Sequence, residues 1–238
     1  MAPSFSSHHE KIVPDVAFNL IKLQHDKVGF RWLKQNRKRS EILAAARVLM
    51  DDVGYERFSV SLLVDRLGFS RQTLYNLAGD RSRILLDSIA DYAEALVDIA
   101  KESNDYPNPV IALADLYWIV ASKNENFIRA AMDCLFGDNA GVKQEVRSIG
   151  YNIRLHLLRT MVLKRQLHSH TNCQCLAQQL VTMNSASFHE WKAGLGTLDF
   201  HRSQSMRVTA ALIQGSLSKE YRIGLEEWLS EFFTRSSR

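Results

Sequence analysis

The sequence has few of the residues that interrupt helices, with 4 prolines and 11 glycines among 238 residues. Both shares lie below those of typical soluble proteins. The three cysteines are an odd number, which argues against a disulfide-based scaffold and fits a reducing compartment. No apolar run of about 18 residues occurs, and the first residues do not have the pattern of a signal peptide. These absences predict an all-α protein of the cytoplasm with no membrane segment.

The charge of the chain is unevenly distributed. The overall composition, with 46% hydrophobic and 24% charged residues, is that of a globular protein and excludes a disordered chain. Residues 31–83 hold 11 Lys and Arg against 6 Asp and Glu, whereas residues 84–238 hold 16 against 17. The net charge of +4 therefore arises from one segment. A polyanion such as DNA would bind there, and a solvated basic surface is the alternative.

The first part of the chain contains two helical patterns before the turn at Gly54. Residues 1–36 form an N-terminal extension that is polar and aperiodic at first, and apolar spacing from Asp15 onward suggests a short extra helix. From Ser40 to Val53 apolar residues recur at the spacing of one helix face, and Gly54 ends the pattern.

Two short helices separated by a tight turn follow. Ser59 is a candidate N-cap of the first, which ends at Gly68, and Ser70 is a candidate N-cap of the second. This arrangement is a helix-turn-helix. A longer helix is expected from Asp80 or Arg81 to about residue 103.

The order and spacing of several residues in this region match a known family. The match consists of Arg37-Lys38-Arg39 before the helix that contains Glu41 to Ala46, Gly54-Tyr55, Phe58-Ser59-Val60, the helix-turn-helix from Leu63 to Tyr75, and Asp80 to Leu86. On these residues the segment 37–103 resembles the N-terminal DNA-binding domain of the TetR family of bacterial transcriptional regulators. Two positions depart from the family pattern, since Ala78 stands where an aromatic residue is usual and Arg81 stands where a lysine is usual.

The second short helix would read DNA in the major groove. We expect Arg71 to pair with guanine, Gln72 with adenine, and Thr73 to contact a thymine methyl group or a phosphate. Contacts with phosphates are expected from Tyr75, Arg81, Arg37, Lys38 and Arg39, and from the helix N-termini at Ser59 and Ser70, and Asn76 completes the predicted set. The alternatives are a core position for Tyr75 and solvated polar side chains for the others.

The C-terminal half is predicted to be a helical bundle. Two of the four prolines, Pro107 and Pro109, mark the expected boundary. We therefore divide the chain into the extension, a DNA-binding domain (37–83), a connecting helix (84–103) and a ligand-binding and dimerisation domain (104–238). Helical stretches are expected at 109–122, 124–136, 140–166, 174–193 and 203–234.

The family resemblance implies a small-molecule effector and a homodimer. The segment around Trp191-Lys192-Ala193-Gly194, and a second helix ending near Leu212 to Gly215, resemble the paired dimerisation helices of the family. Candidate ligand contacts are Tyr117, Trp118, Phe127, Met132, Phe136, Arg154, His156 and Met161, for all of which core packing is the alternative. A buried Arg154 or His156 would favour an anionic ligand, although both could lie on the surface.

One further cluster, His168, His170, Cys173 and Cys175, contains the ligand types of a zinc site. Its spacing is too short for the usual zinc motifs, so an interhelical loop is the alternative, and no metal or cofactor is predicted.

Two functional hypotheses follow from these patterns. The leading hypothesis is a ligand-responsive regulator, in most cases a repressor, that binds a palindromic operator as a dimer. The second is an architectural DNA-binding protein whose C-terminal bundle serves only protein contacts. An enzyme is not predicted, because no nucleophile elbow, phosphate loop or paired-carboxylate motif is evident.

Overall fold

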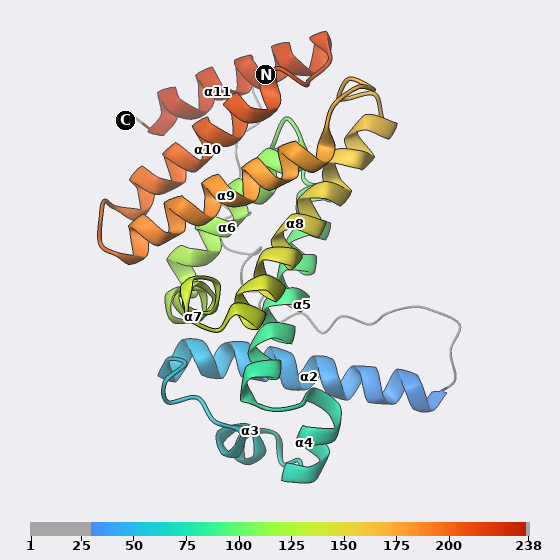
Figure 1. Cartoon of the computed structure of the whole chain (residues 1–238), viewed down its shortest axis with the longest axis vertical. Helices are drawn as coiled ribbons and strands as arrows, with labels where there is room; N and C mark the ends of the chain where they lie inside the picture. The colour runs from blue at the N-terminus through green and yellow to red at the C-terminus, as the bar shows by residue number, and fades with distance from the viewer. Residues whose placement is uncertain (1–29, 237–238) are drawn as a thin grey trace. The chain divides into compact units, whose positions relative to one another are not determined.

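The described part of the chain is entirely helical. This computed structural model describes residues 30–236, with side chains for residues 37–234. Its helices are α2 (Phe30–Val53), α3 (Val60–Leu67), α4 (Arg71–Ala78), α5 (Arg81–Glu102), α6 (Pro109–Lys123), α7 (Glu125–Phe136), α8 (Ala140–Leu163), α9 (Cys173–Lys192), α10 (Leu198–Gln214) and α11 (Lys219–Ser236) (Figure 1). Within residues 30–236 no strand forms, and the one isolated bridge joins Leu167 to Leu217. The predicted all-α class is confirmed.

The chain divides into two compact units. Among the described residues, the first unit contains 30–96 and Ile119–Val146, and the second contains Val97–Trp118 and 147–236. Helices α5, α6 and α8 contribute residues to both units. These boundaries differ from the predicted domains, because α7 belongs to the same unit as the helix-turn-helix.

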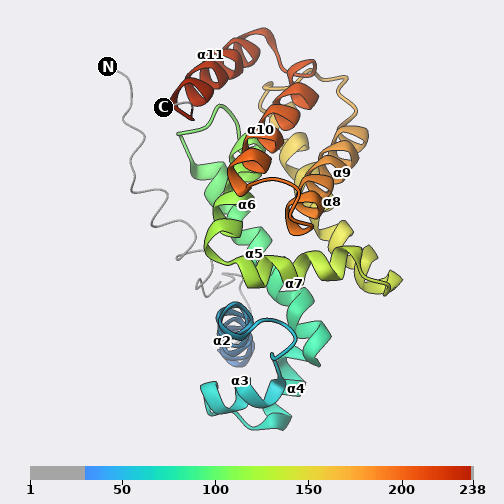
Figure 2. The same ribbon diagram turned by 90° about the vertical axis from the view of Figure 1, so that its left-hand side faces the viewer.

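In the first unit, α3 and α4 lie side by side against α2 (Figures 1 and 2). Ile42 and Leu43 of α2, Leu63 of α3, Leu74 of α4 and Ile84 of α5 are each at most 1% exposed. Burying these five apolar side chains stabilises the unit, because each removes most of its apolar surface from water. Helix α7 packs against α2 as well.

Capping residues define the helix-turn-helix. The Ser59 hydroxyl accepts a hydrogen bond from the Leu62 amide, and the Ser70 hydroxyl accepts one from the Thr73 amide. Gly68 ends α3 with a φ of 66°, in the left-handed region that glycine tolerates without a steric cost. The predicted N-caps and the predicted helix-turn-helix are thereby confirmed.

The start of α2 differs from the prediction. Helix α2 begins at Phe30, so the basic residues at 37–39 lie within the helix and do not precede it. The reason is that no proline or glycine interrupts residues 30–53, and most residues there are good helix formers. The short extra helix predicted from Asp15 falls on residues 1–29, outside the described residues, except for its last positions, which belong to α2.

The helical stretch expected at 203–234 consists of two helices, α10 and α11, and α10 ends at Gln214, within the expected helix end at Leu212 to Gly215. The chain turns at residues 215–218, where the His168 amide donates to the Ser216 carbonyl and the Ser218 amide donates to the Gln166 carbonyl. The segment 166–168, which is distant in sequence, therefore stabilises this turn. Helix α10 also begins earlier than expected, because the Thr197 hydroxyl accepts a hydrogen bond from the Phe200 amide and caps it.

In the second unit, α9 and α10 run side by side and α11 packs beside α10 (Figure 1). Trp118 is fully buried in an aromatic cluster, where its ring stacks on Phe188 with centroids 4.1 Å apart. The Asp115 carboxylate is also buried and accepts two hydrogen bonds from Arg202, at 2.6 and 2.8 Å, and one from the Tyr106 hydroxyl at 2.8 Å.

Candidate nucleic-acid interface

Helix α4 presents one polar face to solvent. Arg71, Gln72, Tyr75 and Asn76 are exposed, whereas Leu74 is buried in the unit's core. The exposed positions follow the helical repeat, so these side chains project from one side of the helix. The core alternative for Tyr75 does not apply in this structure, since 48% of the residue's surface is exposed.

Short contacts hold the polar side chains of α4 in place. The Arg71 guanidinium donates to the Ser61 hydroxyl of α3 at 2.5 Å, and the Gln72 amide donates to the Asn76 side-chain oxygen at 2.9 Å. The Ser70 and Thr73 hydroxyls lie 2.8 Å apart, and Thr73 is half-buried. The face therefore combines fixed hydrogen-bond donors and acceptors, which is what reading of base edges requires.

The basic residues on α2 differ in how free they are to contact phosphates. Arg37 is exposed and pairs with Glu41 one turn later at 3.3 Å. The Lys38 ammonium lies 5.5 Å from the ring centroid of Phe69, in the turn between α3 and α4. Because exposed ion pairs and cation–π contacts are weak, both residues can exchange these contacts for a phosphate.

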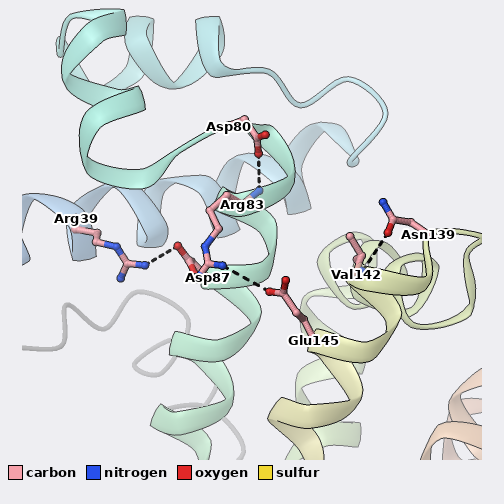
Figure 3. Close-up of polar contacts among 7 residues, drawn as sticks. All are labelled: Arg39, Asp80, Arg83, Asp87, Asn139, Val142 and Glu145. Atoms are coloured by element: carbon pink, nitrogen blue, oxygen red, sulfur yellow. Dashed lines mark hydrogen bonds and ion pairs between the residues drawn. The ribbon is translucent and has the colours of Figure 1, made fainter.

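Arg39 is engaged in an internal network. It donates to the buried Asp87 carboxylate of α5 at 2.5 Å, and Arg83 binds the same carboxylate at 2.7 Å (Figure 3). Arg83 also lies 3.5 Å from Glu145 of α8. The hydrogen bond and charge of Asp87 raise the pKa of Arg83. A contact between Arg39 and DNA, which the sequence predicts, would compete with this ion pair.

The two helices that carry Arg83 and Glu145, α5 and α8, both begin with a side-chain cap. The Asp80 carboxylate accepts a hydrogen bond from the Arg83 amide at 2.8 Å at the start of α5, and the Asn139 side chain accepts one from the Val142 amide at 3.1 Å at the start of α8 (Figure 3). These caps satisfy amides that the helix itself leaves without acceptors. They fix the two helix starts from which Arg83 and Glu145 project.

Arg81, another predicted phosphate contact, packs inside the domain. Its guanidinium lies over the Tyr55 ring, 4.1 Å from the centroid, and donates to the Tyr55 carbonyl oxygen. Its Nε atom is buried without a hydrogen-bond partner. In this structure Arg81 therefore positions the loop after α2 against the start of α5, and its predicted contact with DNA would add to that role.

Sequence reasoning missed two polar contacts that hold α2 in place. Arg47 is fully buried on the apolar face of α2 and donates to Asp91 of α5 at 2.7 Å. Burial lowers the pKa of Arg47, while Asp91 opposes that effect. Asp51, in the last turn of α2, accepts a hydrogen bond from the Phe127 amide of α7 at 3.2 Å. The position of a charged residue on an apolar helix face could have indicated the buried role of Arg47. The contact of Asp51 could not be predicted in this way, because its partner is 76 residues away in the sequence.

The predicted ligand contacts fall into both units. Phe127, Met132 and Phe136 lie on α7 in the first unit, and Tyr117, Trp118, Arg154, His156 and Met161 lie in the second. Trp118, Phe127, Arg154 and Met161 are buried, Tyr117 and Met132 are half-buried, and Phe136 and His156 are exposed. The structure brings together Tyr117 and Arg154, whose guanidinium lies 5.4 Å from the Tyr117 ring centroid.

The His and Cys cluster lies in the turn before α9 and in its first turn. The rings of His168 and His170 stack with centroids 5.4 Å apart, Cys173 is half-buried and Cys175 is exposed. Across the described residues, no group of three or more His, Cys, Asp and Glu side chains is placed to hold a metal ion. None of the helices described above combines the length and apolar character that crossing a membrane requires.

Comparison with known proteins gives a family match for the helix-turn-helix segment. Residues 42–86 match the sequence model described as bacterial regulatory proteins of the tetR family. The comparison with curated proteins gave no significant match.

Several solved structures have the same fold. A TetR-family transcriptional regulator from Pectobacterium atrosepticum is 18% identical with a TM-score of 0.56, and the match covers 78% of this chain and 97% of that one. SmeT, the repressor of the Stenotrophomonas maltophilia multidrug efflux pump SmeDEF, is 16% identical with a TM-score of 0.53, over 77% and 92% of the two chains. The R. erythropolis transcriptional repressor QsdR is 21% identical with a TM-score of 0.54, over 76% and 96%.

The matched residues run from α2 to the second turn of α5 and include the complete helix-turn-helix with its exposed α4 face. The similar structures extend the likeness in fold over most of the chain. Residues 42–86, which include the complete helix-turn-helix, are therefore similar to the tetR family of bacterial regulatory proteins, and the chain has the fold of solved TetR-family transcriptional regulators.

Proposed function

We propose that this protein is a ligand-responsive transcriptional repressor that binds a palindromic operator as a homodimer. The observation that carries the proposal is the exposed face of α4, on which Arg71, Gln72, Tyr75 and Asn76 lie together. Arg and Gln side chains form bidentate hydrogen bonds with guanine and adenine, respectively, in the major groove. Repressors named among the solved structures of this fold support the direction of regulation.

Phosphate contacts would come from residues around this face. Lys38 and Arg37 on α2 carry charges that only weak contacts occupy, and Ser59 and Ser70 lie at helix N-termini, where amide groups suit phosphate oxygens. Such contacts contribute affinity and register, and little information about sequence. The two groups of residues should therefore respond differently to substitution.

Dimerisation is proposed through α9 and α10. The segment 173–188 of α9 contains no charged residue. Its exposed residues are Gln174, Cys175, Gln178, Gln179, Thr182, Met183 and Ala186. An uncharged exposed face 16 residues long is unusual for a helix in contact with water and typical of one that packs against a partner. A two-fold dimer would place two helix-turn-helix units on half-sites about 34 Å apart.

A response to a ligand requires that the two states of the protein bind DNA differently. Helix α7 belongs to the same unit as α2, and its Phe127 amide donates a hydrogen bond to Asp51 of α2. A shift of α7 would therefore displace α2, against which α3 and α4 pack. The predicted ligand contacts on α7 therefore lie on a helix that contacts α2 directly.

Selection of bound DNA from random sequence tests the proposal. The full chain should enrich one palindrome with two half-sites. On that site, Arg71→Ala should weaken discrimination at a single base pair by about 1–3 kcal/mol, whereas Lys38→Ala should weaken binding to all sequences and lower the salt slope by about one. Lys164→Ala, which removes an exposed charge outside the predicted interface, is the matched control and should change neither quantity.

Three outcomes would count against the proposal. Binding without any sequence preference would indicate an architectural protein instead. Identical effects of Arg71→Ala and Lys38→Ala would contradict the assigned roles. Enrichment of a single, asymmetric half-site would contradict the dimer.

A further inference from the structure

Buried charges in the described part of the chain are paired, with one exception. Four Asp, Glu, Lys or Arg residues are buried there: Arg47, Asp87, Asp115 and Arg154. Arg47 pairs with Asp91, Asp87 with two arginines, and Asp115 with Arg202. No carboxylate among the described residues forms an ion pair with Arg154, although only 6% of this residue is exposed.

The contacts of Arg154 are with uncharged groups. Its Nη1 donates to the Gly150 carbonyl oxygen one turn earlier on α8, at 3.1 Å. The guanidinium lies over the ring of Tyr117 from α6, 5.4 Å from the ring centroid. Neither partner carries a charge that could compensate the guanidinium, and burial lowers the pKa of Arg154.

The surroundings of Arg154 are apolar along its helix. Leu157, Leu158 and Met161 follow it at the spacing of one helix face, and each is at most 1% exposed. Gly150 gives the guanidinium room, because a Cβ at this position would lie 3.4 Å from Nη1 of Arg154. The charge is therefore held at one end of a buried apolar row.

A guanidinium is always ionised in proteins and is costly to bury without a counter-charge. Five N–H donors in a planar fork fit a carboxylate particularly well. We infer that Arg154 and Tyr117 form the anion-binding end of an effector site for an amphipathic carboxylic acid, whose apolar body packs against the buried residues of α8. This inference rests on the proposed function, since it names the chemical class of the proposed effector.

Tyr117 would complete the site as a neutral donor. Burial raises the pKa of Tyr117, so its hydroxyl keeps its proton at neutral pH and can donate to a carboxylate oxygen. On binding, the carboxylate would accept hydrogen bonds from the Arg154 guanidinium and from the Tyr117 phenol. An amine or a neutral amide of equal shape lacks the charge that Arg154 requires.

The test measures the Tm of the full chain with a panel of linear and aryl-terminated monocarboxylates of four to sixteen carbons. The primary amide of each carboxylate serves as its uncharged control. At least one carboxylate should raise the Tm of the wild-type chain while its amide does not. Arg154→Met should weaken binding of that carboxylate by roughly 30-fold or more. Arg159→Met, which removes an exposed arginine from the same helix, is the matched control and should keep the full shift.

The free protein provides a second measurement. Because Arg154 has no counter-ion, Arg154→Met should leave the Tm of the ligand-free chain unchanged or raise it. A fall of more than a few degrees would assign Arg154 a purely structural role and overturn the inference. It is also overturned if no carboxylate shifts the Tm, or if Arg154→Met and Arg159→Met respond to the panel alike.

The inference and the proposed function can fail separately. If a carboxylate binds through Arg154 but does not change the affinity for the selected DNA, the site stands and the ligand response falls. If neutral compounds release the DNA equally from wild type and Arg154→Met, the ligand response stands and the anion site falls.

Discussion

The contact between α2 and α7 leads to a prediction that separates two neighbouring aspartates. The residue before α7, Asn124, makes no capping hydrogen bond with its side chain. Asp51 supplies the cap from α2, because its Oδ1 accepts from the Phe127 backbone amide at 3.2 Å and its Oδ2 accepts from the Asn124 side-chain Nδ2 at 3.5 Å. Asp52, the next residue, is exposed and pairs with Arg66 at 3.3 Å.

The expected cost of Asp51→Ala follows from these contacts. Loss of a capping acceptor costs about 0.5–2 kcal/mol, and loss of a negative charge at a helix N-terminus adds about 0.3–1 kcal/mol. We expect Asp51→Ala to lower the free energy of unfolding by about 1–2.5 kcal/mol. Asp51→Asn keeps an acceptor and loses only the charge, so it should cost about 0.3–1 kcal/mol. Asp52→Ala should cost at most about 0.5 kcal/mol, because exposed ion pairs contribute little.

Urea unfolding of the three variants measures these differences, and hydrogen exchange of the Phe127 amide locates them. For a chain of this length, 1 kcal/mol corresponds to a Tm change of about 2–4 °C. The Phe127 amide should exchange faster in Asp51→Ala than in Asp52→Ala. If the two alanine variants are equally stable and equally protected at Phe127, then α7 is not capped from α2 and the reasoning is refuted.

Three further predictions concern the second unit and the cysteines. Arg202→Met leaves the buried Asp115 carboxylate without its counter-ion and should cost about 3–5 kcal/mol in urea unfolding; a loss under 1 kcal/mol would contradict this. Burial raises the pKa of Tyr106 above its ordinary value, so above pH 10 only the unfolded state releases this proton and stability falls by about 1.4 kcal/mol per pH unit; Tyr106→Phe should flatten that decline. Burial raises the pKa of the Cys134 thiol, so at pH 8 a thiol reagent should modify the exposed Cys175 first, as peptide mass spectrometry would record.

Local signals explain why much of the fold could be predicted. Ser59, Gly68 and Ser70 act through contacts within four residues, so the sequence alone locates both helices of the helix-turn-helix. The start of α2 and the break between α10 and α11 have no comparable local capping signal. The break involves a pairing of residues 166–168 with 216–218, which no local pattern records.

The candidate interface was predictable where it depends on local helical periodicity, and not where it depends on contacts between residues distant in sequence. The exposed face of α4 follows from helical periodicity once the helix is placed. The partners of Arg39 and Arg81 are 48 and 26 residues away, so sequence could indicate their charge but not their internal contacts. Likewise, Arg154 and His156 are two residues apart, and only the packing of the second unit determines that the first is buried and the second exposed.

The central claim, sequence-specific binding by a dimer through α4, is tested most directly by titrating the selected palindrome with the full chain. Fluorescence anisotropy at one fixed salt concentration would compare this palindrome with a scrambled duplex of the same length and composition. The account predicts two chains per duplex and an affinity at least about 1,000-fold higher for the palindrome. Equal affinity for the two duplexes, or saturation at one chain per palindrome, would contradict it.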